Sequence, residues 1–138
     1  MFVEKTWWYK GYQCSVVQNM FGHRCGYVVV SIDTKIPMST SEDYSYVDIN
    51  VHGGVTLYED IVMPMGTRAR LGGVVISDGM RVLGFDCGHF YDKPDIEAAE
   101  RRGMYTHGIH LQNGVVRTQS YCEAECRKMV DQIKEFNK

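Results

Sequence analysis

Apolar and polar positions alternate in short segments along most of the chain, and this pattern predicts β-strands joined by turns. Fourteen glycines separate the segments. Four strands are predicted in the first half of the chain, from runs rich in valine, isoleucine and tyrosine: Cys14–Met20, Cys25–Ile32, Tyr46–Val51 and Gly54–Tyr58.

The most clearly marked turn is Asp78-Gly79, because this dipeptide tolerates the positive φ angles of a two-residue type I′ turn. We expect it to close a hairpin between Gly73–Ser77 and Met80–Asp86. Counting outward from the turn places Gly73 opposite Gly84, a patch that a ligand or another backbone can approach closely. Both faces of this hairpin are largely apolar, so a helix, a second sheet or a partner subunit must cover them.

Other turns are less regular. Asn113-Gly114 predicts a second hairpin, with His110 and Leu111 on one side and Val116 and Arg117 on the other. Two polar segments, from Thr34 to Tyr46 and from Tyr58 to Arg70, are predicted to be loops. The second of them is long enough to act as a flap or as an arm toward a partner.

Two helices are predicted, at about 94–102 and about 121–137. The first has Pro94 near its start and Gly103 beyond its end. The second opens with a capping-box pattern from Ser120 to Glu123, and its apolar residues form one stripe at helical spacing. These elements predict an α+β fold in which a mostly antiparallel, twisted sheet built from hairpins carries the C-terminal helix.

The composition narrows the class of protein. The chain has 138 residues, which suits a single domain (1–138), and its formal charge of −2 argues against coating nucleic acid or an anionic membrane. The sequence shows no apolar run near the roughly 20 residues that span a bilayer, and no signal peptide. The five cysteines are an odd number without paired Cys-x-x-Cys knuckles, which favours a reducing, cytoplasmic setting.

The segment Asp86-Cys87-Gly88-His89, closely followed by Asp92, combines two carboxylates, a thiol and an imidazole after a predicted strand. One interpretation is a site for zinc or another divalent metal, with four ligands: His52, Cys87, His89 and Asp92. The spacing matches no zinc finger, metalloprotease or nucleotide deaminase. The structural alternative makes Cys87 a buried hydrophobe and Asp92 a helix cap, with hydrogen bonds from Asp86 and His89 fixing the loop. We therefore expect no cofactor, with a metal as the second choice.

Two further segments suit an anionic ligand. His52-Gly53-Gly54 lies between predicted strands, where its glycines leave backbone amides exposed for a phosphate; the alternative is a plain β-turn with a surface histidine. Near residue 22, His23 and Arg24 are placed to contact a phosphate and Tyr27 to stack on a base. The alternative there is an ordinary hairpin turn.

Three motifs follow one another in a set order: Cys25-Gly26-Tyr27-Val28, His52-Gly53-Gly54-Val55-Thr56, and Gly84-Phe85-Asp86-Cys87-Gly88-His89 with Asp92 soon after. From about residue 22 to its end, the chain resembles a family of small uncharacterised proteins of tailed phages and prophages. The family pattern has Leu at position 55, Ala at position 88, and an aromatic pair within 81–83. The absence of that pair here puts ligand stacking at this strand in doubt.

The resemblance implies a phage origin. Small phage proteins without enzyme motifs often act against host defence, which favours a homo-oligomer that sequesters a nucleotide-derived immune signal, of the cyclic oligonucleotide or cyclic ADP-ribose type. The residues expected to contact this ligand are His23, Arg24, Tyr27, His52, Gly53, Gly54, Asp86 and His89.

Two alternatives stay open. The first is a metal-dependent hydrolase of a phosphodiester or nucleotide, in which His52, Asp86 and His89, together with Asp92, act as ligands or as general acid and base. The second is an inhibitor that binds a host enzyme through the loop from Tyr58 to Arg70.

Overall fold

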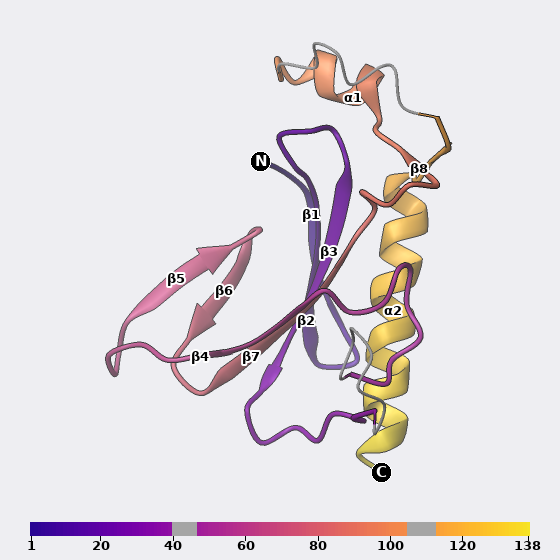
Figure 1. The fold of residues 1–138 in the computed structure, drawn as a ribbon. Helices are drawn as coiled ribbons and strands as arrows, with labels where there is room; N and C mark the ends of the chain where they lie inside the picture. Colours follow the sequence, from indigo (N-terminus) through magenta and orange to yellow (C-terminus); the bar gives the residue numbers. More distant parts are fainter. Residues whose placement is uncertain (40–46, 105–112) are drawn as a thin grey trace.

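A five-stranded antiparallel sheet forms the centre of the molecule (Figure 1). The computed structural model describes residues 1–39, 47–104 and 113–138. Across the sheet the strands follow the order β1 (Phe2–Tyr9), β2 (Tyr12–Gln18), β3 (Arg24–Ser31), β7 (Met80–Asp86) and β4 (Leu57–Ile61). The predicted α+β class, with an antiparallel sheet, a short helix and a C-terminal helix, is confirmed.

One face of the sheet is covered by α2 (Gln119–Phe136). The predicted apolar stripe is buried there, including Cys126, Met129 and Ile133 against β2 and β3. The predicted cap was wrong by two residues. Thr118, not Ser120, is the N-cap, because its hydroxyl accepts a hydrogen bond from the Tyr121 amide at 3.1 Å.

The predicted hairpin around Asp78-Gly79 was wrong in its pairing. The turn forms, but it leads from β6 (Val74–Ser77), which pairs with β5 (Arg68–Leu71), into β7, which lies between β3 and β4. The hairpin turn is instead Gly72-Gly73, where both residues have positive φ. The middle of β7, from Val82 to Phe85, is buried. A position between β3 and β4 gives this strand ladder partners on both sides, which a simple hairpin cannot provide.

Gly84 consequently does not face Gly73. It lies opposite Tyr27 on one side and Leu57 on the other. A Cβ at Gly84 would stand 2.8 Å from Cδ1 of Tyr27, so the space at this glycine is filled by the tyrosine ring.

Strands also form where the sequence did not predict them. β1 was not predicted, because its run of aromatic and charged residues does not alternate cleanly; Trp7 packs on the core while Trp8 is exposed. The predicted loop from Tyr58 to Arg70 contains the end of β4 and the start of β5, so only 62–67 joins them.

One predicted strand is largely absent, and one predicted hairpin lies partly outside the described residues. Of the strand predicted at Tyr46–Val51, Val47 forms an isolated bridge with Met38, and 48–51 run as an irregular segment; Tyr46 lies outside the described residues. At the second predicted hairpin, His110 and Leu111 also lie outside them. β9 (Val115–Val116) pairs in parallel with β8 (Asp92–Lys93).

The other predicted helix is shorter than expected: α1 spans Ile96–Arg101 and is capped by Asp95. It is attached to the sheet by a buried network of charges. Arg24 makes a two-point contact with Glu4, at 2.6 and 3.1 Å, and an ion pair with Asp95 at 2.9 Å. Arg102 also contacts Glu4 at 2.9 Å. Two cations thus face two carboxylates, which balances the buried charge.

The five cysteines are free and buried. Within the described part of the chain, no helix combines the length and apolarity needed to cross a membrane.

Substituting Glu4→Gln should lower the free energy of unfolding by about 3–5 kcal/mol, because Arg24 would keep only the ion pair with Asp95 and Arg102 would lose the carboxylate it contacts. Urea denaturation followed by circular dichroism measures the change. Glu97→Gln is the matched control, since its ion pair with Arg101 lies on the exposed face of α1 and should matter little. An equally small effect at both positions would contradict the role assigned to the network.

Candidate functional site

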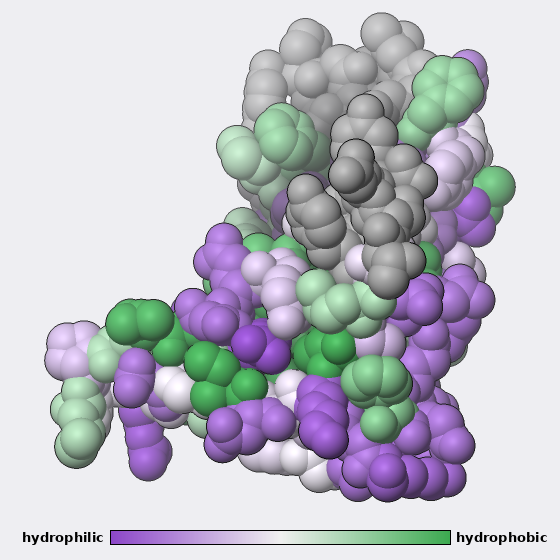
Figure 2. Space-filling view, turned by 60° about the horizontal axis from the view of Figure 1, so that its bottom comes forward, coloured by the Kyte–Doolittle hydropathy of each residue, from purple (hydrophilic) through white to green (hydrophobic). Residues whose placement is uncertain are grey.

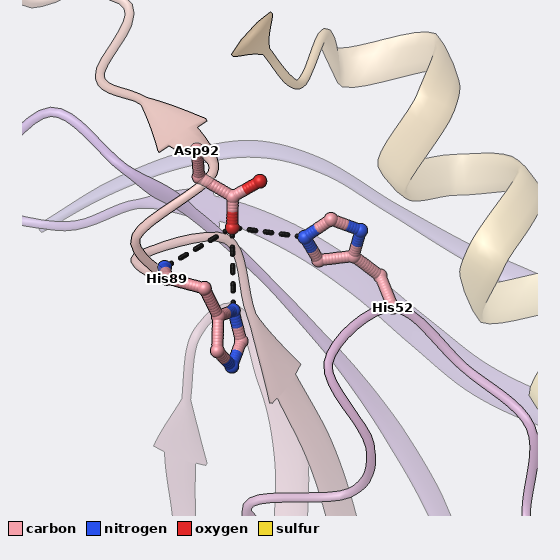
Figure 3. A group of neighbouring side chains, drawn as sticks. All are labelled: His52, His89 and Asp92. Atoms are coloured by element: carbon pink, nitrogen blue, oxygen red, sulfur yellow. Dashed lines mark hydrogen bonds and ion pairs between the residues drawn. The ribbon is translucent and has the colours of Figure 1, made fainter. Parts of the chain in front are cut away.

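The side chains of His52, His89 and Asp92 converge at the end of the molecule where β7 leaves the sheet (Figure 3). His89 lies in the short connection from β7 to β8, and Asp92 is the first residue of β8. His52 lies on the irregular segment 47–56, which α2 holds in place. Glu125 of α2 accepts a hydrogen bond from the His52 amide at 2.9 Å, and Gln132 bonds both backbone polar groups of Asn50.

The Asp92 carboxylate is the centre of this group. Its Oδ2 atom accepts hydrogen bonds from three directions: His52 Nε2 at 2.9 Å, His89 Nδ1 at 3.2 Å and the His89 backbone amide at 3.1 Å. Its Oδ1 atom accepts from Arg117 Nε at 2.9 Å. The side chain has 0% of its surface exposed, so these donors replace the water that the carboxylate has lost.

The charge of Asp92 follows from this balance. Burial on its own raises the pKa of a carboxyl group, but the hydrogen bonds from His52, Arg117 and the His89 amide outweigh it, and the pKa of Asp92 lies below its ordinary value. The hydrogen bond to Asp92 raises the pKa of Arg117 in turn. Asp92 is therefore ionised at neutral pH.

Both ring nitrogens of His52 have partners. Nε2 meets Asp92, and Nδ1 lies 2.8 Å from the hydroxyl of Tyr121, the third residue of α2. The ring also makes edge contacts with Tyr91 and Tyr121, each at 5.4 Å between centroids. The ring orientation is thus set from two sides, as expected for a histidine whose reactive nitrogen must point in one direction.

The ring of His89 stacks on Tyr91 and fills the space that a side chain at position 53 would occupy. Its ring lies parallel to that of Tyr91, at 5.4 Å and an interplanar angle of 5°. On its other side is Gly53, where a Cβ would come within 2.1 Å of His89 Cε1. The second residue of the predicted His-Gly-Gly turn is therefore glycine because an imidazole occupies the space of its side chain.

The site opens to a surface cavity of about 610 Å³. His89 and Asp92 line its inner end, and the exposed Phe90 and the half-exposed Tyr91 line its rim, together with Gly88, Asn113, Gly114 and Val115. His89 keeps 27% of its side-chain surface exposed, whereas Asp92 is closed off behind it.

Two of the separations match those of neighbouring ligand atoms around a metal: Asp92 Oδ2 lies 2.9 Å from His52 Nε2 and 3.2 Å from His89 Nδ1. One nitrogen of each histidine and one oxygen of Asp92 all lie within 4.8 Å of one another. Ligand atoms around a tetrahedral zinc ion, at their usual bond lengths, are about 3.3 Å apart. Arg117 and Tyr121 would stand behind Asp92 and His52 as the outer partners that fix metal ligands.

The other residues predicted for the site are placed differently. Asp86 lies at its margin, 3.8 Å from His89 Nδ1, and accepts hydrogen bonds from Thr56 and the Gly88 amide. Cys87, predicted as a possible ligand, points into the core. Its Sγ is 3.6 Å from that of Cys122, and this contact together with burial raises the pKa of the thiol. The proposed role of Asp92 as a helix cap is taken by Asp95.

The predicted phosphate and base contacts at 23–27 lie apart from the cavity lining. Arg24 belongs to the buried network with Glu4 and Asp95. His23 is buried beside Gly88, and Tyr27 packs on the opposite face of the sheet with the second apolar cluster. Gly54 follows Gly53 with open space around it.

Sequence reasoning missed the contributions of Tyr91 and Tyr121. Tyr121 lies just before the buried stripe of α2, and its position in the first helical turn was the signal that could have identified it. Tyr91 lies between His89 and Asp92 in the sequence, and no periodic pattern of residues marks it there.

Comparison with known proteins yielded no match to a family model, to a curated protein or to a solved structure. The resemblance to phage-encoded proteins stays a prediction, and a function must be inferred from the site itself.

Gly53→Ala should disturb the site more than Gly54→Ala. Both residues have positive φ, so each alanine costs about 1–2 kcal/mol of backbone strain. Only the Cβ at position 53 collides with His89, so only that variant should also shift the imidazole NMR resonances of His89. Equal destabilisation with unchanged His89 resonances in both variants would contradict the close approach.

Asp92→Asn should destabilise the protein at neutral pH by about 1–3 kcal/mol, because charged hydrogen bonds to buried donors are lost. The folded-state pKa of Asp92 is lowered, so its contribution is present above the unfolded pKa of about 3.9 and is lost as the pH falls through the lower folded value. The difference in unfolding free energy between the wild type and the variant should therefore shrink below about pH 4. Asp48→Asn, at an exposed carboxylate, is the control; a difference between the wild type and the Asp92→Asn variant that grows on acidification would refute this assignment.

Proposed function

We propose that this chain is a metal-dependent hydrolase of a phosphodiester or nucleotide, with His52, His89 and Asp92 as the ligands of one divalent ion. The observation that carries the proposal is the convergence of His52 Nε2, His89 Nδ1 and Asp92 Oδ2 beside a surface cavity that His89 and Asp92 line. Two imidazoles and one carboxylate are a common catalytic ligand set, and three protein ligands leave a coordination position for water.

The hydrogen bonds of His52 favour this role. Without a metal, Nε2 donates to Asp92. Metal ligation uses the other tautomer, in which Nδ1 carries the proton and donates it to the Tyr121 hydroxyl oxygen, and Nε2 presents a lone pair toward His89 and Asp92. Metal ligation at Nε2 therefore needs no change in the position of the ring. Zinc suits the mixed nitrogen and oxygen ligands, and it would supply a polarised water or hydroxide at neutral pH.

Two neighbouring side chains have roles in such a reaction. Asp86 is partly exposed, and its hydrogen bonds from Thr56 and Gly88 hold it 3.8 Å from His89, a position from which a carboxylate can accept a proton from water. Arg117 keeps part of its guanidinium exposed while it stacks over Tyr91 and Tyr121, at 5.9 and 5.3 Å. A guanidinium there can bind the negative charge of a phosphate.

Binding without turnover is the second candidate, in line with the sequestration of a nucleotide immune signal. The exposed ring of Phe90 beside the cavity favours it, because an aromatic face can stack on a base. The Asp92 carboxylate is also satisfied by protein donors alone. A phage counter-defence protein would fit this mode, which differs from the first in leaving the ligand intact.

The test is metal content and turnover measured on the same protein. We expect about one zinc or manganese ion per chain by mass spectrometry after loading, and hydrolysis of bis(p-nitrophenyl) phosphate or a cyclic dinucleotide. His89→Ala should abolish both. Tyr121→Phe keeps the ring but removes the hydroxyl that holds His52, so it should weaken metal affinity by about tenfold to a hundredfold. Asp48→Asn should leave both unchanged.

The outcomes separate the two candidates. Metal retention without turnover of any phosphoester contradicts the hydrolase. A nucleotide recovered intact after heating its complex with metal-free protein supports sequestration instead.

A further inference from the structure

Two strands that are adjacent in sequence, β4 and β5, do not pair with each other. β4 pairs only with β7 and ends the sheet on that side, and β5 pairs only with β6. Among the strands of the described residues, each of the two therefore has one open edge. The six residues 62–67 between them are enough for a hairpin, so their separation needs a cause.

The cause is that the β5–β6 ribbon is fastened over the face of the sheet opposite α2. Ser15 donates a hydrogen bond to the Gly72 carbonyl, and the Gln13 side-chain amide bonds both the N–H and the carbonyl of Val75, at 3.1 and 3.0 Å. Leu71 and Ile76 pack on the apolar cluster of that face. The ribbon consequently projects from the body, with apolar side chains gathered where it departs (Figures 1 and 2).

The same contacts show which backbone groups of β5 are open. Val75 turns its N–H and carbonyl toward Gln13, and in an antiparallel ladder its partner Arg70 then turns its own groups the opposite way. Arg68 has the same parity as Arg70. The outer edge of β6 is thus occupied at Val75 by Gln13, while the outer edge of β5 presents the backbone of both arginines.

The two open strands carry opposite charges. β4 exposes Glu59 and Asp60, of which Asp60 forms an ion pair with Arg81 of β7, and β5 exposes Arg68 and Arg70. Between them, the connecting segment exposes Val62 to 86% and Met65 to 98%. The edges of β4 and β5 are similar in length and complementary in charge. The attachment of the ribbon to the sheet keeps them from pairing within one chain.

We propose that β5 of one molecule adds to β4 of a second copy, and that the reciprocal contact forms at the same time. A two-fold axis makes both contacts equivalent and leaves neither of these edges open. Val62 and Met65 are then covered at the interface. This dimer does not depend on the function proposed for the His52 site.

The mass in solution tests the proposal. Light scattering after size exclusion should give twice the chain mass of 15.8 kDa. Glu59→Arg and Arg68→Glu each place like charges at both contacts, so each should weaken dimerisation about tenfold or more. In a one-to-one mixture of these two variants, one contact has both charges reversed and the other has neither, so a heterodimer should form. Glu97→Arg, on the exposed face of α1, should leave the mass unchanged.

Hydrogen exchange locates the contact. The amides of Arg68 and Arg70 should gain protection as the protein concentration rises through the dimerisation range. A protein that stays monomeric up to about 100 µM, which is 100 times a micromolar dissociation constant, overturns the proposal. A dimer unaffected by either charge reversal, a mixture that does not re-form it, or unprotected β5 amides would overturn it as well.

Discussion

The buried carboxylate of Asp92 is the interaction on which the arrangement of the site depends. It is bonded to the neighbouring connection at His89 and to two segments that are distant in sequence, the turn at His52 and the strand end at Arg117. A carboxylate removed from water requires donors on both oxygens, and each donor here comes from a segment without long regular structure of its own. Satisfying one buried charge therefore fixes three otherwise irregular segments relative to one another.

The scaffold behind these segments is helix α2 rather than the sheet. Tyr121, Glu125 and Gln132 all face the segment 47–56 and hold it by hydrogen bonds. Since α2 is itself packed on β2 and β3 through its apolar stripe, the site inherits its position from the core. Helix α1 is held on the sheet in a similar way, by the buried network of Glu4, Arg24, Asp95 and Arg102.

The two helices and the location of the site at His52 and His89 could be predicted from the sequence, because helical periodicity and clusters of rare side chains are local signals. Strand pairing could not. Asp78-Gly79 has the residues of a hairpin turn and does form a turn, but whether the strands on either side of it pair depends on distant partners, which β7 finds in β3 and β4. Likewise, the composition of the segment 86–92 did not distinguish Asp92, which faces the histidines, from Cys87, which faces Cys122.

The attachment of the ribbon through Gln13 and Ser15 affects which residues of this protein can be replaced during evolution. The candidate metal ligands lie on the segment around His52 and on the chain that follows β7. The open edges belong to β4, which pairs with β7, and to β5 on the separate ribbon, which is attached to the sheet through other residues. Residues in 62–71 can therefore be replaced without moving any atom that touches Asp92. The proposed metal site and the proposed dimer contact thus use different residues of one small framework, so that the contact can diverge while the site is retained.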